Sequence, residues 1–274
     1  MQQRTLAFIG AGNMSRSIIA GLIQAGYPAE RIIAANPSRP KLDELASQFG
    51  IRITQDNAEA AREAEVIVLA VKPQLMAGML TALVAELGSL DGKLLISIAA
   101  GIRVARLQEM AGGHDRIIRT MPNTPSLLGL GMTGLYAPPA IGQADRAVAE
   151  QMMQSVGKTL WVDEEAGING VIAAAGSAPA YFFLFMQAIA EEAEAMGFRP
   201  EQARLLVQQT ALGAAAMVEQ NPDLSLQTLR EQVTSKGGTT AEAVKTFQEQ
   251  GLMPLTARAM QAAVTRAGEM ETLF

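Results

Sequence analysis

Residues 8–15 (FIGAGNMS) constrain the fold of this chain most, because they place a glycine-rich turn between an apolar run and a helical pattern. Residues 5–9 are short and apolar, as in a buried strand, and residues 18–23 have the apolar spacing of a helix. A strand, a glycine turn and a helix in this order are typical of a dinucleotide-binding unit. A tight turn without a ligand is the alternative interpretation.

Each small residue of the turn has a physical role in such a unit. Gly10 lacks a Cβ atom and allows a tight turn. Gly12 lets the backbone approach a pyrophosphate, whose charge then lies at the N-terminus of the helix. Ser15 replaces the third glycine of the pattern and is small enough for close packing of helix on strand.

Short β-like runs alternate with amphipathic stretches as far as residue 163, and this alternation predicts a doubly wound parallel sheet. The predicted strands are residues 5–9, 31–35, 65–70, 93–98 and 116–120, with 131–136 as a further strand and 159–162 as an edge strand. The predicted helices between them include residues 41–49 and 74–87.

Helical patterns replace the β-branched runs after residue 163. They predict helices over residues 164–175, 178–196, 200–219, 225–233, 240–250 and 254–273. The predicted fold class is therefore α/β: a Rossmann-type doubly wound parallel sheet over residues 1–163, followed by an all-helical domain over 164–274. The helices have apolar faces to cover, which favours dimerisation through this second domain.

Composition excludes several classes of function. The 274 residues include 22 Lys and Arg against 27 Asp and Glu, and the net charge of -5 argues against nucleic acids and anionic membranes as partners. The chain has no cysteine, which favours a reducing cytoplasm. We expect no metal site, because the only histidine, His114, follows two glycines in a loop-like stretch and is predicted to be solvated. Residues 178–190 are apolar but too short to span a bilayer, and they are predicted to form a buried helix.

The end of the second predicted strand indicates which nicotinamide cofactor is bound. An acidic residue there would contact the ribose hydroxyls of NAD, but this chain has Asn36, Ser38 and Arg39 instead. A guanidinium matches the geometry of a phosphate, so the pattern favours NADP(H). An ordinary polar turn is the alternative. Asn57, further along the chain, is placed beside the adenosine.

Three more loops follow predicted strands at the sheet edge where doubly wound folds bind ligands. The first contains Ala70, Val71, Lys72 and Pro73, and the second contains Ala99, Ala100 and Gly101. The third contains Asn123 and Thr124 between two prolines, which stiffen the loop as a wall facing a nicotinamide would require.

Residues 233–240 (VTSKGGTT) form a second glycine-rich turn, in the helical half. Their backbone N–H groups and hydroxyls suit a small anion such as a carboxylate. The same stretch fits a different interpretation equally well, because Thr239 and Glu242 have the spacing of a capping box that needs no ligand.

The motifs FIGAGNM, AVKP, SIAAG, MPNTP, GSAPAY and VTSKGGTTAEAV follow one another in this chain. In this order they resemble the pyrroline-5-carboxylate reductase family. They run from residue 8 to residue 244. FIGAGNM and MPNTP also fit several related dehydrogenases, whereas GSAPAY followed by the GGTT segment is much more specific to this family. Lys236 stands where the family has proline more often, which concerns only the stiffness of the turn.

The resemblance implies a set of binding residues. The cofactor residues would be Gly10, Ala11, Gly12, Asn13, Met14, Asn36, Ser38, Arg39, Asn57, Ala70, Val71, Lys72, Pro73, Ala99, Ala100, Gly101, Asn123 and Thr124. The substrate residues would be Ser177, Ser235, Gly237, Gly238, Thr239 and Thr240, with Tyr181 helping to shape that side. The hydroxyl of Thr240 would approach the ring nitrogen of the substrate, as a catalytic residue.

The resemblance also implies an activity and an assembly. The reaction would be reduction of the cyclic imine 1-pyrroline-5-carboxylate to L-proline by NADPH, with NADH as a further cofactor, in the cytoplasm. The helical domains would interlock into a homodimer, and five dimers would form a decamer. Hydride transfer to a protonated imine needs no metal and no covalent intermediate, in keeping with a chain that has no cysteine and one histidine. No side chain is assigned as proton donor.

Two alternatives remain. A β-hydroxyacid dehydrogenase-like NADP enzyme needs a base, a lysine early in the helical domain, but only Lys236 and Lys245 follow Lys158. A non-catalytic NADP(H)-sensing module would keep the first glycine turn but would not need the second.

Overall fold

A computed structural model describes residues 4–274 of the chain. These residues form two compact units. One, here called the sheet unit, extends to Ser177 and also contains Ala263–Phe274, while the other, the helical unit, comprises Ala178–Ala262. The prediction placed the division after residue 163. That boundary stays a prediction, and Glu165 and Glu271 both pair with Arg119 within the sheet unit.

The sheet unit contains one sheet of eight strands in the described residues, in the order β3-β2-β1-β4-β5-β6-β7-β8. The strands are β1 Leu6–Ile9, β2 Ile32–Ala35, β3 Arg52–Thr54, β4 Val66–Leu69, β5 Leu94–Ser97, β6 Ile117–Met121, β7 Gly131–Tyr136 and β8 Gly157–Trp161. The predicted doubly wound sheet and the predicted edge strand are confirmed. One pairing differs, because β7 runs antiparallel to β6, whereas every other neighbouring pair is parallel.

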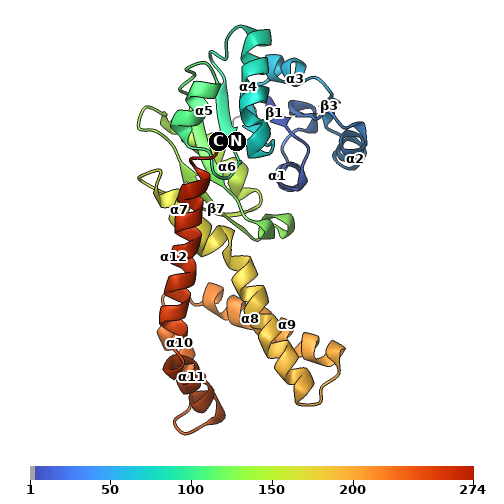
Figure 1. The fold of residues 1–274 in the computed structure, drawn as a ribbon. Coiled ribbons are helices and arrows are strands. Elements are labelled where there is room, and N and C mark those ends of the chain that lie inside the picture. The colour runs from blue at the N-terminus through green and yellow to red at the C-terminus, as the bar shows by residue number, and fades with distance from the viewer. Residues whose placement is uncertain (1–3) are drawn as a thin grey trace. The chain divides into compact units, whose positions relative to one another are not determined.

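Helices cover both faces of this sheet (Figure 1). They are α1 Asn13–Gln24, α2 Arg39–Phe49, α3 Asn57–Glu63, α4 Pro73–Leu87, α5 Val104–Met110, α6 Gln143–Gln154 and α7 Gly167–Val171, with short η1 Ala29–Arg31, η2 Thr124–Leu128 and η3 Ile172–Gly176. Successive residues of a strand point to opposite faces of the sheet. In β1, Phe8 belongs to the core formed with α1, α2 and α6, and Ile9 belongs to the core formed with α3, α4 and α5. Each face therefore has its own core.

The segment after β8 differs from the single helix predicted over residues 164–175. It consists of the short helix α7 and the wider π-helical turn η3. The N–H of Ser177 donates to the carbonyl of Ile172 at 2.7 Å, which closes that wider turn. Three glycines lie here, Gly167, Gly170 and Gly176, and glycine is a poor helix former in an interior position. The regular helix begins only at Ala178.

The helical unit contains α8 Ala178–Ala195, α9 Pro200–Gln220, α10 Leu226–Gln232 and α11 Thr239–Glu249. The last helix, α12 Leu252–Met270, begins in this unit and ends in the sheet unit. The helices lie within three residues of their predicted bounds, since proline at the start of α9 and glycine before α11 mark where they begin.

The prediction of a buried helix over residues 178–190 is wrong for the single chain. Phe182, Phe183 and Leu184 of α8 are 64–67% exposed. An apolar composition does not distinguish a face covered by the same chain from one covered by another chain. Among the described residues, the helical stretch Gly167–Ala195 has the length and apolarity of a membrane-crossing helix, which is weak support for a membrane because core helices pass the same test. The absence of a membrane partner stays a prediction.

Candidate active site

Four parallel strands end at the same level of the sheet, and the predicted cofactor loops begin there. Ile9 pairs with Ala35 and with Leu69, and Leu69 pairs in turn with Ser97. The loops that follow β1, β2, β4 and β5 therefore start side by side. This carboxyl-terminal edge is where open α/β sheets bind their ligands.

The first glycine turn requires a glycine at position 10. Gly10 has a φ of +113°, and a Cβ atom on it would lie 2.5 Å from the carbonyl oxygen of Ala70. Ser15 is fully buried and its hydroxyl donates to the carbonyl of Gly10 at 2.6 Å. The serine that replaces the third glycine therefore does more than allow close packing, because it also fixes the turn.

The N-terminus of α1 is open to an anion. Gly12 occupies the N-cap position, has no side chain with which to cap the helix, and nothing lies within 4 Å of where its Cβ would be. The first N–H groups of α1 thus lack a side-chain partner, and the helix dipole favours negative charge at this point. These features fit the pyrophosphate of a dinucleotide, next to Asn13 and Met14, the first two residues of the helix.

Asn36 joins the second loop to the first. Its side-chain oxygen accepts from the N–H of Ala11 at 3.3 Å, and its amide nitrogen donates to the carbonyl of Ser38 at 3.1 Å. Ser38 is the N-cap residue of α2 and makes no side-chain capping bond. Arg39 is exposed, and its Nε donates to Asp43 on the same helix at 2.7 Å. Exposed pairs of this kind contribute little, so the guanidinium is free to rearrange.

Asn57 begins α3, directly after the N-cap residue Asp56, whose carboxylate accepts from two backbone N–H groups of the helix. It borders an open hollow of about 320 Å³ between α3 and α4. Met79 and Leu83 of α4 supply apolar walls to this hollow. The predicted place of Asn57 beside an adenosine has no direct test here.

The remaining predicted cofactor residues lie in three loops of the same sheet edge. Ala70 and Val71 are half-buried before Lys72, the N-cap residue of α4, which Pro73 follows in its first turn. Ala99 donates to the hydroxyl of Ser97 at 3.3 Å. Ala100 is half-buried, and Gly101 adopts a φ of +74°.

The side chain of Asn123 makes two hydrogen bonds to the backbone. Its amide donates to the carbonyl of Ala175 at 3.0 Å and its side-chain oxygen accepts from the N–H of Met132 at 2.9 Å, so both ends are occupied. Thr124, the next residue, is exposed and opens η2. Of this pair, Thr124 has the side chain that is accessible to a ligand.

The turn at residues 235–240 lies wholly in the helical unit. Gly237 has a φ of +71°, and Gly238 is the N-cap residue of α11 and makes no side-chain capping bond. Thr239 is therefore the first helical residue and not the cap, so the capping box of Thr239 and Glu242 does not form. The first N–H groups of α11 remain without a side-chain partner, beside exposed Ser235, Thr239 and Thr240.

Ser177 and Tyr181 are half-buried around the start of α8. Ser177 is the last residue of the sheet unit in this part of the chain, and Tyr181 belongs to the helical unit. The role of both residues at a substrate stays a prediction.

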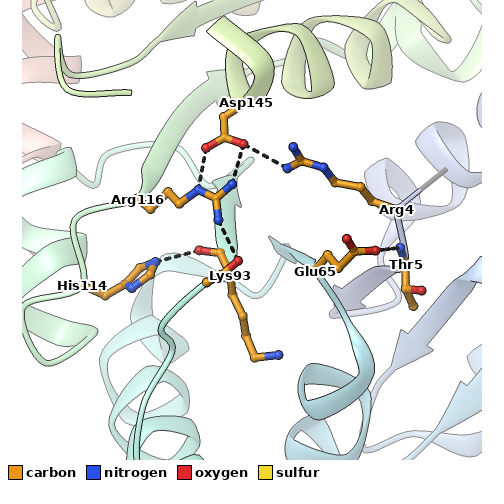
Figure 2. A network of polar contacts seen from close by, with 8 residues as sticks. Arg4, Thr5, Glu65, Lys93, His114, Arg116 and Asp145 are labelled. Carbon is orange, nitrogen blue, oxygen red and sulfur yellow. Dashed lines mark hydrogen bonds and ion pairs between the residues drawn. The ribbon is translucent and has the colours of Figure 1, made fainter. Parts of the chain in front are cut away.

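Polar groups at the opposite edge of the sheet form a separate network (Figure 2). Asp145 of α6 accepts from Arg116 at 2.5 and 2.7 Å and from Arg4 at 2.9 Å. Burial alone would raise the pKa of Asp145, but the hydrogen bonds from Arg116 and Arg4 outweigh it and hold the pKa below its usual range. This network ties α6 to the residues before β1 and β6, away from the ligand edge.

His114 belongs to the same region and is not the solvated loop residue that was predicted. It is half-buried, and its Nε2 lies 3.0 Å from the carbonyl oxygen of Lys93 (Figure 2). The ammonium of Lys93 donates to the carbonyls of Arg62 and Ala64 at the end of α3. Burial lowers the pKa of Lys93. These contacts are all structural.

Sequence reasoning missed a buried ion cluster beneath the cofactor loops. Arg119 in β6 has a side chain that is 1% exposed, and it pairs with Glu165 and Glu271 at 2.9 Å each. The one signal in the sequence was a charged residue inside an apolar strand (IIRTM), because such a residue needs a buried partner. The partners of Arg119 are far away in the sequence, and no sequence motif predicts which residues they are.

A Rossmann-type sheet with an open glycine turn, followed by a helical unit, is typical of nicotinamide-dependent oxidoreductases. Two family models match in keeping with this class: residues 5–101 match "NADP oxidoreductase coenzyme F420-dependent", and residues 165–270 match "Pyrroline-5-carboxylate reductase dimerisation". The chain is 58% identical over its whole length to the pyrroline-5-carboxylate reductase of Vibrio alginolyticus, and 47% identical to that of Haemophilus influenzae, with both proteins fully covered in each case.

Solved structures agree with these relatives. The chain is similar to a pyrroline-5-carboxylate reductase from Coxiella burnetii, with a TM-score of 0.93, 41% identity and coverage of 98% of this chain and 99% of the other. It is also similar to pyrroline carboxylate reductase of Plasmodium falciparum with NADP bound, with a TM-score of 0.84, 28% identity and 99% coverage of both chains. The chain belongs to the pyrroline-5-carboxylate reductase family and is an oxidoreductase.

Proposed function

We propose that this chain reduces 1-pyrroline-5-carboxylate to L-proline with NADPH, the last step of proline biosynthesis. One observation carries the proposal on the substrate side: α11 begins without a side-chain cap, beside three exposed hydroxyl residues and a left-handed Gly237. Such a helix start leaves its first N–H groups free of a side-chain cap, and the N-terminus of a helix favours an anion. The names of the full-length relatives support the same reaction.

The sheet unit supplies the cofactor site in this proposal. Gly10, Ala11, Gly12, Asn13 and Met14 hold the pyrophosphate, and Arg39 with Asn36 and Ser38 faces the 2′-phosphate. Asn57 borders the adenosine, and the ribose and nicotinamide lie against Ala70, Val71, Lys72, Pro73, Ala99, Ala100, Gly101, Asn123 and Thr124. When bound, NADPH supplies a hydride from C4 of its nicotinamide. NADH, which lacks the phosphate, is accepted less well.

The helical unit supplies the substrate turn. The N–H groups of Gly237 and Thr239 bind the substrate carboxylate, and the positive end of the α11 dipole strengthens that contact. Gly238 shapes the turn, because its own N–H donates to the carbonyl of Ser235 at 3.0 Å. Ser235 lines the same turn, and Ser177 and Tyr181 shape the substrate side. The Thr240 hydroxyl hydrogen-bonds the ring nitrogen and fixes the face of the ring that is shown to the nicotinamide.

Bond changes in the substrate need no nucleophile from the chain. As the hydride adds to the imine carbon, the π electron pair of the carbon–nitrogen double bond moves to the nitrogen, which already holds a proton. The chain orients the ring and excludes water. No residue needs to form a covalent bond, and no side chain is assigned as the source of the proton.

The assembly in this proposal is a homodimer built mainly from the helical unit, and five dimers associate into a decamer in the cytoplasm. The match of residues 165–270 to a dimerisation domain supports a homo-oligomer. The exposed apolar face of α8, with Phe182, Phe183 and Leu184, is the kind of surface that a second copy covers.

Removing the hydroxyl of Thr240 tests whether the turn at residues 235–240 binds the substrate. Thr240→Val keeps the shape of the side chain and removes its hydroxyl, so we expect kcat/KM for the imine to fall by about ten- to a hundredfold, the size of one lost hydrogen bond whose partner is left unmet. The dissociation constant for NADPH, measured without substrate, should not change.

Thr246→Val is the matched control. It removes a hydroxyl from the same helix, but that hydroxyl donates only to the carbonyl of Glu242, at 2.9 Å. Its kcat/KM should stay within about twofold of the wild-type value. Full activity in Thr240→Val, or a parallel loss of NADPH binding, would show that the turn has no substrate role.

A further inference from the structure

The cluster around Arg119 is the largest buried ionic feature that the proposed reaction does not use. NH1 of Arg119 lies 2.9 Å from Oε1 of both Glu165 and Glu271, and Nε of Arg103 lies 3.7 and 3.9 Å from the same two carboxylates. All four residues belong to the sheet unit. Arg119 and the two carboxylates are largely buried, while the side chain of Arg103 is 54% exposed and adds a second positive charge beside them.

The two glutamates flank the places where the chain passes between its units. Glu165 precedes α7, after which the chain leaves the sheet unit at Ser177. Glu271 directly follows α12, the helix that brings the chain back. One guanidinium in the middle of β6 therefore holds both connecting segments.

The same cluster contacts the loop proposed for the nicotinamide. Oε1 of Glu165 accepts from the N–H of Val104 at 2.8 Å, at the start of the helix that follows Gly101. A Cβ atom on Gly101 would lie only 3.3 Å from Cβ of Met270, the last residue of α12. The end of the returning helix thus packs directly on this cofactor loop.

Stability alone does not account for this arrangement. NH2 of Arg119 is buried without a hydrogen-bond partner, and a well-packed apolar side chain at this place would avoid that cost. Replacing a buried ionic cluster by apolar groups is often neutral or stabilising. A charged cluster is, however, directional, and it fixes three segments in one register.

We propose that Arg119 is a positioning residue for hydride transfer, which acts through Glu165 and Glu271 to fix both connecting segments against the Gly101 loop. This inference rests on the proposed function, in which the cofactor loops belong to the sheet unit and the substrate turn to the helical unit. Loss of these ion pairs should then impair turnover more than NADPH binding.

The test is Glu271→Gln, which keeps the shape of the side chain and removes one charge at a partly accessible position, 11% exposed. We expect kcat/KM for 1-pyrroline-5-carboxylate to fall by about tenfold, mainly through kcat, with the NADPH dissociation constant within about twofold of wild type. Glu271→Asp, which keeps the charge, should recover part of the loss. The turnover number is divided by the concentration of NADPH-binding sites, so that unfolded protein does not lower the measured value.

Glu269→Gln is the matched control, because Glu269 lies at the same end of α12 but pairs only with exposed Arg266, at 2.6 Å. The inference is overturned if the turnover of Glu271→Gln per NADPH site equals that of Glu269→Gln, or if NADPH binding weakens as much as turnover. A wild-type chain that bound NADPH but did not reduce the imine would instead overturn the proposed function. Arg119→Met is less useful, because two carboxylates would remain buried without their main partner.

Discussion

The sheet unit and the helical unit cover their apolar surfaces in different ways. In the sheet unit, strands such as β1 and β4 are buried on both faces by helices of the same chain. In the helical unit, α8 leaves Phe182, Phe183 and Leu184 more than 60% exposed. The sheet unit therefore has its own core on each face of the sheet, whereas the helical unit leaves an apolar face that a second chain could cover.

The largest expected effect comes from placing a charge on that uncovered face. Phe183→Glu should dissociate the homo-oligomer and lower the turnover by more than about a hundredfold, because a carboxylate would be buried twice in a symmetric interface without a partner. Light scattering reports the mass, and the assay with NADPH and 1-pyrroline-5-carboxylate reports the turnover.

Leu160→Glu provides the contrast from the sheet unit. Leu160 on β8 is 50% exposed, and its substitution should leave the mass of the oligomer unchanged. If Phe183→Glu also kept the wild-type mass, the uncovered face of α8 would not be the interface. A second chain would then not explain why this face is exposed.

A second experiment asks whether the sheet unit is stable through its own contacts. Asp145→Asn should lower the free energy of unfolding by about 3 kcal/mol, because Arg116 and Arg4 would lose the carboxylate that both of them contact. Urea unfolding measures the loss. The mass of the oligomer should not change, since Asp145 lies in the sheet unit.

The same residue predicts a dependence on acid. The pKa of Asp145 is below its unfolded value of about 3.9, so its contribution is complete above that pH and is lost as the pH falls through the lower folded value. Asp145→Asn should therefore flatten the stability profile at acidic pH. An unchanged profile would show that the network of Figure 2 contributes no stability through this carboxylate.

The smallest expected effect concerns cofactor choice, which the proposal assigns to the sheet unit alone. Arg39→Ala should weaken NADPH binding by about tenfold and spare NADH, because one charge-assisted contact to the 2′-phosphate is lost. The wild-type arginine must first give up Asp43, which keeps the effect modest. Calorimetry with each cofactor measures it.

Arg62→Ala is the control for this change, because Arg62 is another exposed helical arginine, paired with Glu86 at 3.0 Å. It should alter neither affinity. An equal loss for NADPH and NADH in Arg39→Ala would mean that Arg39 does not distinguish the cofactors.

Much of the fold could be predicted because local patterns specify it. The glycine turn at Gly10 and the fully apolar β4 mark a parallel sheet and its ligand edge, and the positions of most elements follow. The short β3, α3 and α5 were not predicted, since three to seven residues carry too weak a periodicity, and α6 was not predicted either. The strand β7 was predicted, but its antiparallel direction was not, because strand direction depends on pairing partners.

The candidate site shows the same limit. Sequence motifs named the loops, but they left two interpretations of the turn at residues 235–240. The structure excludes the capping box, because Gly238 and not Thr239 occupies the N-cap position. The backbone angles of three successive residues decide that position, and residue types at a fixed spacing do not determine them.

The sequence by itself determined the class of fold and the family, because these depend on residues close together in the chain and on a glycine at position 10, where the positive φ favours glycine. Only the tertiary structure decided that Arg119 joins Glu165 and Glu271, and that α8 keeps an uncovered apolar face. Such contacts depend on where distant segments meet. A buried charge shows in the sequence that it needs partners, but only the packed chain shows which ones it finds.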